Sequence, residues 1–215
     1  MTATSLTFDE LLTRAESLVT RGRRSILGIV GAPAAGKTTL ARGLADALGN
    51  RAVVVGMDGF HLAQVELQRL GRTERKGAPD TFDAFGYVSV LRRIRETEDT
   101  VYAPLFRREI EEPIAGAVCV PPEVPLVITE GNYLLVDESP WCDVRGLVDE
   151  VWYLRPDEQE RIERLVTRHR RYGRTLVEAR GRALGSDQRN ADLIETTAAK
   201  ADLLLENLPL QNFVI

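Results

Sequence analysis

A phosphate-binding motif lies near the start of the 215-residue sequence. The segment GAPAAGKT, Gly31 to Thr38, matches the pattern G-x-x-x-x-G-K-[ST] in full. The two glycines let the backbone curl so that its N–H groups point at phosphate oxygens. Lys37 would place a positive charge on the β- and γ-phosphates, and the Thr38 hydroxyl can ligate Mg²⁺. The residues expected to bind a nucleotide are Gly31, Ala32, Pro33, Ala34, Ala35, Gly36, Lys37, Thr38 and Thr39, and Lys37 is also expected to be catalytic.

Two carboxylates follow apolar runs farther along the chain. Asp58 comes after AVVVG, and Glu130 ends LVITE. Ligands of open α/β sheets bind at the carboxyl ends of the strands, so both carboxylates are expected at one edge. We expect Asp58 to act as the base for an acceptor hydroxyl and to assist Mg²⁺ binding, and Glu130 to organise Mg²⁺ with Thr38. The alternative for either carboxylate is a loop turn or a helix cap.

His61, three residues after Asp58, has two interpretations of similar weight. It either contacts the acceptor or has a packing or capping role.

A basic helical region spans about residues 157–190. Its arginines at 161, 164, 168 and 171 recur at helical spacing, which places them on one face. Acidic neighbours become sparse after Glu163, so we expect a closing lid in which Arg168 and Arg171 reach the transferring phosphoryl group. The alternative is a solvated surface whose arginines pair with acids one turn away.

The elements that position these residues follow from the hydrophobic pattern. Apolar runs that do not alternate with polar residues predict buried strands at 26–31, 52–56, 126–130, 150–154 and 202–206. Helical stretches between them predict a parallel sheet covered on both faces. Before the first strand, Thr7 and Glu10 are spaced as a capping box at the start of a helix. The fold class is therefore α/β, with three layers.

The chain is expected to form a single domain over residues 1–215. The stretch from about 60 to 125 is rich in Gly, Pro and charge, and we expect it to hold the acceptor-binding elements.

Composition excludes several classes of protein. The net charge of −4 argues against general binding to nucleic acid or a membrane surface. Cys119 and Cys142 have no metal-ligand spacing, which argues against a zinc site or a disulfide framework. The first residues lack the features of a secretory signal and no apolar stretch is long enough to span a membrane, so a cytoplasmic protein is expected. The sequence does not determine the oligomeric state, and a homodimer is one possibility.

The segments GAPAAGKTT, VVVGMDGFH, RKGAPDTFD, YAPLFRREIEEP and VITEGNYLL resemble the superfamily of phosphoribulokinase, uridine kinase and bacterial pantothenate kinase. The resemblance covers nearly the whole chain and is nearest to a branch named as nucleoside/nucleotide kinases or fructose-transport-system kinases. It implies a five-stranded parallel sheet in the order 2-3-1-4-5, ATP with Mg²⁺, an aspartate base after the second strand and an arginine-bearing lid. These features map onto Asp58 and the basic helix.

The resemblance also implies roles for residues outside the motifs above. Arg75, Lys76 and Asp83 match a pantothenate kinase segment next to its acceptor helix, and Asn207, after the last strand, is expected to border adenine. Tyr102 and Arg107 lie in the hairpin that carries acceptor-binding residues in uridine kinases.

Arg107 and its neighbour Arg108 leave two interpretations open. They either pair with nearby glutamates or bind an anionic acceptor.

Together these features predict an ATP-dependent kinase that phosphorylates a hydroxyl of a small sugar-, nucleoside- or pantothenate-like molecule. The alternative is a regulatory P-loop NTPase or a nucleotide sensor without an acceptor.

Overall fold

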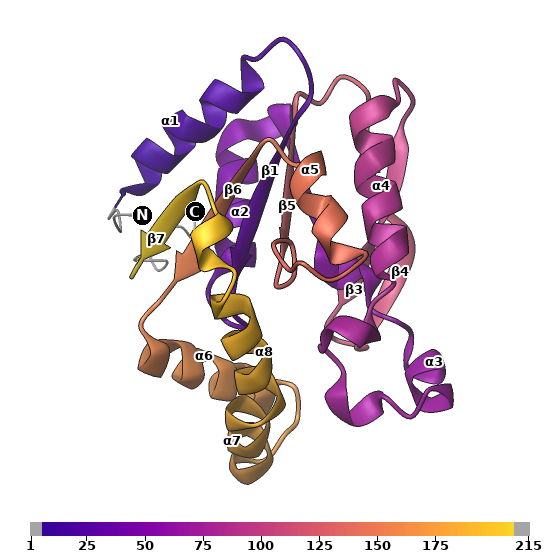
Figure 1. Ribbon diagram of the computed structural model, residues 1–215, viewed down its shortest axis with the longest axis vertical. Coiled ribbons are helices and arrows are strands. Elements are labelled where there is room, and N and C mark those ends of the chain that lie inside the picture. Colours follow the sequence, from indigo (N-terminus) through magenta and orange to yellow (C-terminus); the bar gives the residue numbers. More distant parts are fainter. Residues whose placement is uncertain (1–5, 209–215) are drawn as a thin grey trace.

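The structure is a computed structural model that describes residues 6–208. Its centre is a five-stranded parallel sheet (Figure 1). The strands are β1 (Ser25–Gly31), β2 (Ala52–Gly56), β5 (Leu126–Gly131), β6 (Glu150–Arg155) and β7 (Leu203–Glu206). Their spatial order is β2-β5-β1-β6-β7, which is 2-3-1-4-5 when these five strands alone are counted. The predicted fold class and strand order are confirmed.

Helices cover both faces of the sheet because successive strand residues point to opposite sides. On one face, Leu27 and Ile29 of β1 pack with α1 (Phe8–Val19) and α2 (Lys37–Leu48). On the other face, Ile26 and Val30 belong to a cluster with α4 (Ala84–Glu96) and α5 (Val144–Leu147). The sheet is therefore buried on both sides, as its continuous apolar strands indicated.

Local signals set the starts of several helices. Thr7 and Glu10 form the predicted capping box of α1, with Thr7 N donating to Glu10 at 2.8 Å. In the lid, Asp157 caps α6 (Glu158–Arg171) by accepting from Glu160 N at 3.0 Å. A second capping box, Thr175 with Glu178, begins α7 (Leu176–Leu184).

Two regions project from the layers. The acceptor region contains α3 (Gln64–Arg69) and an antiparallel hairpin of β3 (Val101–Arg107) and β4 (Glu112–Val120), and it adjoins α4 of the helical layer. The lid contains α6, α7 and α8 (Ser186–Glu195). Figure 1 shows α3 and the lid helices at the same end of the molecule, with a space between their ribbons. Short 3-10 turns occupy Gly49–Arg51, Met57–Phe60, Thr73–Arg75, Pro79–Thr81, Trp141–Asp143 and Ala198–Lys200.

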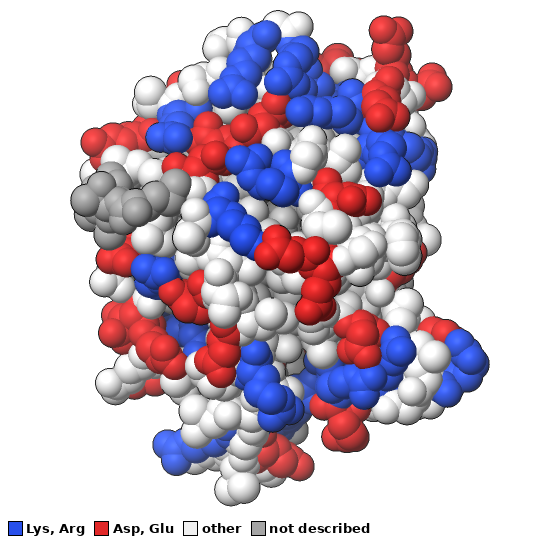
Figure 2. Space-filling model, in the orientation of Figure 1, with Lys and Arg blue, Asp and Glu red and all other residues white. Residues whose placement is uncertain are grey.

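The surface and the cysteines agree with the composition. Basic and acidic side chains are interspersed over the described part of the face in Figure 2. Cys119 and Cys142 are exposed free thiols. Across residues 6–208, none of the helices combines the length and apolar character needed to cross a bilayer.

Candidate active site

The loop from Gly31 to Thr38 joins β1 to α2 through a tight turn. Ala34 and Gly36 have positive φ angles of 66° and 99°, which curl the backbone. Gly31 lies so close to β6 that a Cβ at this position would be 2.6 Å from the carbonyl oxygen of Leu154. The first N–H groups of α2 have no partner within the helix, and they face the end of the loop where an anion would bind.

Lys37 is buried and folds back over the loop. Its Nζ donates to the carbonyl oxygens of Gly31 and Ala32 at 2.9 and 3.0 Å and to Asn132 Oδ1 at 2.8 Å. Burial lowers the pKa of Lys37 to about 8, although the charges of Glu130 and Asp58 oppose this shift. The ammonium group is therefore held at the loop by oxygen acceptors that phosphate oxygens could replace.

Glu130 and Thr38 meet beneath the loop. Thr38 Oγ1 donates to Glu130 Oε1 at 3.0 Å, and the Glu130 side chain is buried at the end of β5. Burial, and then repulsion from Asp58, raises the pKa of Glu130. Two hard oxygen ligands thus lie side by side, which is a donor set that suits Mg²⁺.

Asp58 lies in the 3-10 turn after β2 and forms an ion pair that the sequence analysis did not assign. Arg108, from the β3–β4 turn, donates to Asp58 Oδ2 at 2.8 Å. Burial alone would raise the pKa of Asp58, but its interactions with His61, and then with Arg108 and Lys37, hold it below its usual value. The carboxylate is therefore kept ionised, as a proton acceptor must be.

His61 supports the turn that carries Asp58. Its Nδ1 lies 2.8 Å from the Asp58 carbonyl oxygen, to which it donates. The imidazole packs between Phe82 and Phe106, at centroid distances of 4.0 and 4.7 Å. Burial lowers the pKa of His61, which favours the neutral ring. His61 thus has the packing role that the sequence left open, and its side chain also lines the cavity.

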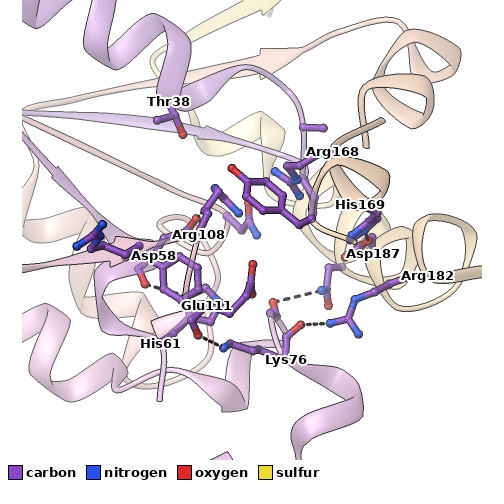
Figure 3. A pocket seen from close by; sticks show the side chains of 18 of the residues that line it. Thr38, Asp58, His61, Lys76, Arg108, Glu111, Arg168, His169, Arg182 and Asp187 are labelled. Atoms are coloured by element: carbon purple, nitrogen blue, oxygen red, sulfur yellow. Dashed lines mark hydrogen bonds and ion pairs between the residues drawn. The ribbon is translucent and has the colours of Figure 1, made fainter. Parts of the chain in front are cut away.

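These groups surround one cavity of about 1250 Å³ between the sheet edge, the hairpin and the lid (Figure 3). It is large enough for a nucleotide and a second small molecule. The predicted site residues that line it are Pro33, Ala34, Gly36, Lys37, Thr38, Thr39, Asp58, His61, Lys76, Arg107, Glu130 and Arg168.

The lid contributes arginines in two different ways. Arg161 is buried and donates to Gln188 at 2.6 Å, and to the carbonyl oxygen of Pro33 at 3.4 Å. Arg168, two helical turns later, lines the cavity within electrostatic range of Asp58. The lid is thus connected to the phosphate-binding loop, with Arg168 directed to the site (Figure 3).

The lid also contacts the acceptor region. Arg182 donates to the carbonyl oxygen of Lys76 at 2.8 Å, and Asn190 donates to that of Gly77 at 3.2 Å. Inside the lid, His169 Nε2 donates to Asp187 at 2.7 Å. The bonds made by Arg182 and Asn190 therefore link the lid to the acceptor region.

Among the predicted loop residues, Gly31, Ala32 and Ala35 do not line the cavity, and five predicted residues outside the loop do not line it either. Arg171 is exposed on α6, and Arg75 pairs with Asp80 at 2.6 Å. Asp83 caps α4 by accepting from Gly86 N at 2.8 Å, which is the helix-cap role that carboxylates often have. Tyr102 points outward from the hairpin. Asn207 is exposed after β7, and its N–H donates to Arg155 O at 3.0 Å.

The lining residues that the sequence analysis did not assign to the site include Arg108, Asn132, Arg174, Arg182 and Asp187. The adjacent pair Arg107–Arg108 was a usable signal for Arg108, but only Arg107 was assigned to the acceptor, and the sequence left open whether the two arginines pair with glutamates or bind an anion. Asn132 follows Glu130 by two residues in the same strand-end segment, so its proximity could also have been inferred.

The fold and its phosphate-binding loop define a P-loop protein of the kinase type. A sequence model described as "Phosphoribulokinase / Uridine kinase family" matches residues 26–213. The chain belongs to this family.

Individual relatives support the assignment. A putative uridine kinase of Schizosaccharomyces pombe is 34% identical over 216 residues, which cover 95% of this chain and 92% of the relative. An ATP-dependent kinase-like protein of Aspergillus versicolor is 33% identical over 168 residues, covering 74% and 92% of the two chains. The crystal structure of a putative fructose transport system kinase from Silicibacter sp. TM1040 superposes with a TM-score of 0.83 at 36% identity, covering 93% and 99%. The chain is thus a phosphotransferase of the P-loop kinase class that acts on small molecules.

Proposed function

We propose that this protein transfers the γ-phosphate of ATP to a hydroxyl group of a sugar-, nucleoside- or pantothenate-like metabolite. The observation that carries the proposal is the placement of Asp58, an ionised carboxylate, across one cavity from the phosphate-binding loop. A nucleotide on the loop and an acceptor beside Asp58 would meet inside this cavity.

The loop and Lys37 would hold the triphosphate. The loop N–H groups and the amino end of α2 would bind its oxygens, and Lys37 would exchange its carbonyl acceptors for the β- and γ-phosphates. Asn207 as a contact to the adenine stays a prediction.

The oxygen atoms of Thr38 and Glu130 fit Mg²⁺, which usually binds through one or two protein oxygens together with substrate phosphates. Among residues 6–208, no group of three or more His, Cys, Asp or Glu side chains is arranged to hold a metal. A bound Mg²⁺ would neutralise charge on the phosphates. Asp58 lies close enough to affect the charge of Glu130, as its predicted assisting role requires.

Asp58 would accept the proton of the acceptor hydroxyl. The hydroxyl oxygen then forms a bond to the γ-phosphorus while the bond from that phosphorus to the bridging oxygen breaks, and ADP leaves with that oxygen. Arg108 keeps Asp58 ionised and fixes one carboxylate oxygen, which leaves Oδ1 for the proton. Arg168 would stabilise the charge on the transferring group.

The test is an ATP-consumption screen of the purified protein with Mg²⁺ against sugars, sugar phosphates, sugar acids, nucleosides and pantothenate. Asp58→Asn should lower kcat by roughly 100- to 10,000-fold while ATP still binds, because it removes the base and keeps the shape. Asp46→Asn, the same chemical change on the exposed side of α2, is the control and should have wild-type activity. ATP hydrolysis that does not depend on any acceptor would instead support a regulatory NTPase, and ATP binding without turnover would support a sensor.

The cytoplasmic location and the homodimer stay predictions.

A further inference from the structure

Three cationic side chains line the end of the cavity that lies away from the phosphate-binding loop. They are Lys76 of the acceptor region, Arg174 of the turn between α6 and α7, and Arg182 of α7. Figure 3 shows Lys76 and Arg182 on the side of the cavity opposite Thr38. We call these three residues the basic cluster.

The hydrogen-bond acceptors of the basic cluster are neutral. Lys76 Nζ donates to the carbonyl oxygen of Glu111, and Arg174 donates to His169 Nδ1 at 2.7 Å. Arg182 donates to the carbonyl oxygen of Lys76. Within the part of the chain that the structure describes, none of the three forms an ion pair, whereas Arg108 in the same cavity pairs with Asp58.

The carboxylates near the basic cluster make their hydrogen bonds elsewhere or act on it only from a distance. Asp187 is bound to His169, and Glu178 accepts from Thr175 in the helix cap. Several carboxylates lie within electrostatic range of the cluster, but in the described part of the chain none of them forms an ion pair with it. They are Glu111 and Glu112 near Lys76, Glu74, Glu111 and Asp187 near Arg182, and Glu178 near Arg174. Arg174 and Arg182 also repel each other, since the charge of Arg174 adds to burial in lowering the pKa of Arg182. An anion bound directly between these cations would relieve that repulsion.

We propose that the basic cluster binds an anionic group of the acceptor, either a phosphate or a carboxylate. The acceptor then has a hydroxyl at Asp58 and its anionic group at the opposite end of the cavity. Guanidinium groups and an ammonium group suit both anions. Because Arg174 and Arg182 belong to the lid, lid closure would depend on the acceptor as well as on the nucleotide. This inference rests on the proposed function, and it narrows the acceptor class to anionic polyols.

The first experiment compares acceptors that differ only in the anionic group. Suitable sets are ribose with ribonate and ribose 5-phosphate, and glycerol with glycerate and glycerol 3-phosphate. We expect the anionic members to have kcat/KM values roughly 10- to 100-fold above the neutral member, as charge-assisted hydrogen bonds would give. The anionic acceptor with the higher kcat/KM shows whether the basic cluster binds a phosphate or a carboxylate. A neutral compound that equals or exceeds both of its anionic partners would overturn the proposal.

The second experiment tests the cluster itself with Lys76→Gln and Arg174→Gln. Each should raise KM for the anionic acceptor by roughly 10- to 100-fold and leave KM for ATP near the wild-type value. Arg170→Gln, on the exposed surface of the same lid helix, is the matched control and should change neither constant. Thermal melts of both variants separate misfolding from lost binding. An equal rise in KM for ATP would assign the cluster to the nucleotide and refute the inference.

A third measurement separates this inference from the proposed function. If no acceptor is phosphorylated, the proposed function fails, but the cluster can still be tested by calorimetric titration of inorganic phosphate or acetate into protein saturated with ADP. If binding is lost in Lys76→Gln and kept in Arg170→Gln, the result would support the anion site even though the proposed function had failed. Binding that is the same in all three proteins, or undetectable in the wild type, would refute it.

Discussion

Asp149 precedes β6 and holds the amino end of β1 in place, on the side of the sheet away from the active site. Its contribution to stability can be tested quantitatively. Its carboxylate accepts from the backbone N–H of Ile26 at 2.8 Å and pairs with Arg23 and Arg95 at 2.5 Å each. Only 4% of the side chain is exposed. Burial would raise the pKa of Asp149, but these bonds outweigh it and lower the pKa from 3.8 to about 2.

The contribution of Asp149 to the free energy of unfolding follows from this pKa shift. Since one pKa unit corresponds to about 1.36 kcal/mol, ionised Asp149 contributes roughly 2 kcal/mol to folding at neutral pH. The folded-state pKa is depressed, so the contribution is fully present above the unfolded value of 3.8 and is lost as the pH falls toward 2. Asp149→Asn imitates the protonated form and should lose about the same amount at pH 7.

The assay is urea unfolding of the wild type and Asp149→Asn between pH 7 and pH 2. The difference in the free energy of unfolding should be roughly 2 kcal/mol at pH 7 and should shrink below about pH 4. Kinase activity at pH 7 and low temperature should be unchanged, because Asp149 lies outside the cavity lining. A difference that stays constant down to pH 2 would show that the ion pairs do not produce the stabilisation.

Three further predictions concern the loop, the lid and the core. Arg168→Ala should lower kcat by at least roughly 100-fold while Arg171→Ala keeps it, and equal kinetics for the two variants would remove Arg168 from the mechanism. Gly31→Ala should weaken ATP binding at least roughly 10-fold in a titration, because its Cβ would meet Leu154 O at 2.6 Å. Tyr87→Phe should destabilise the fold by roughly 1 kcal/mol in urea, since it removes the buried 2.6 Å bond to Thr129; an unchanged midpoint would contradict this.

The fold followed from the sequence because its signals are local. Continuous apolar runs separated by amphipathic helices predict buried parallel strands, and the five predicted strands agree with the structure to within one residue at each end. The phosphate-binding loop is likewise a local motif, whose glycines and lysine carry their function in their spacing. The strand order came from the family resemblance, since strand pairing is not written in any one segment.

The acceptor side of the site was predicted less well, because it depends on which way side chains point. Asp83 and Arg75 were assigned to it from a matching segment, yet one caps a helix and the other pairs with Asp80. Helical spacing alone could not separate Arg168 from Arg171, which lie only about 60° apart around the helix axis. The packing of α6 on its neighbours decides that one faces the cavity and the other faces solvent.

The sequence by itself determined the α/β class, the strands, the nucleotide loop and the carboxylates at the strand ends. Only the tertiary structure decided that Arg108 pairs with Asp58, and that Lys76 gathers with Arg174 and Arg182. The physical reason is distance along the chain. Propensity, periodicity and capping act over a few residues, whereas Asp58 and Arg108 are 50 positions apart, and Lys76 and Arg182 are 106 apart. Contacts of that range exist only after the hairpin and the lid have packed around the sheet.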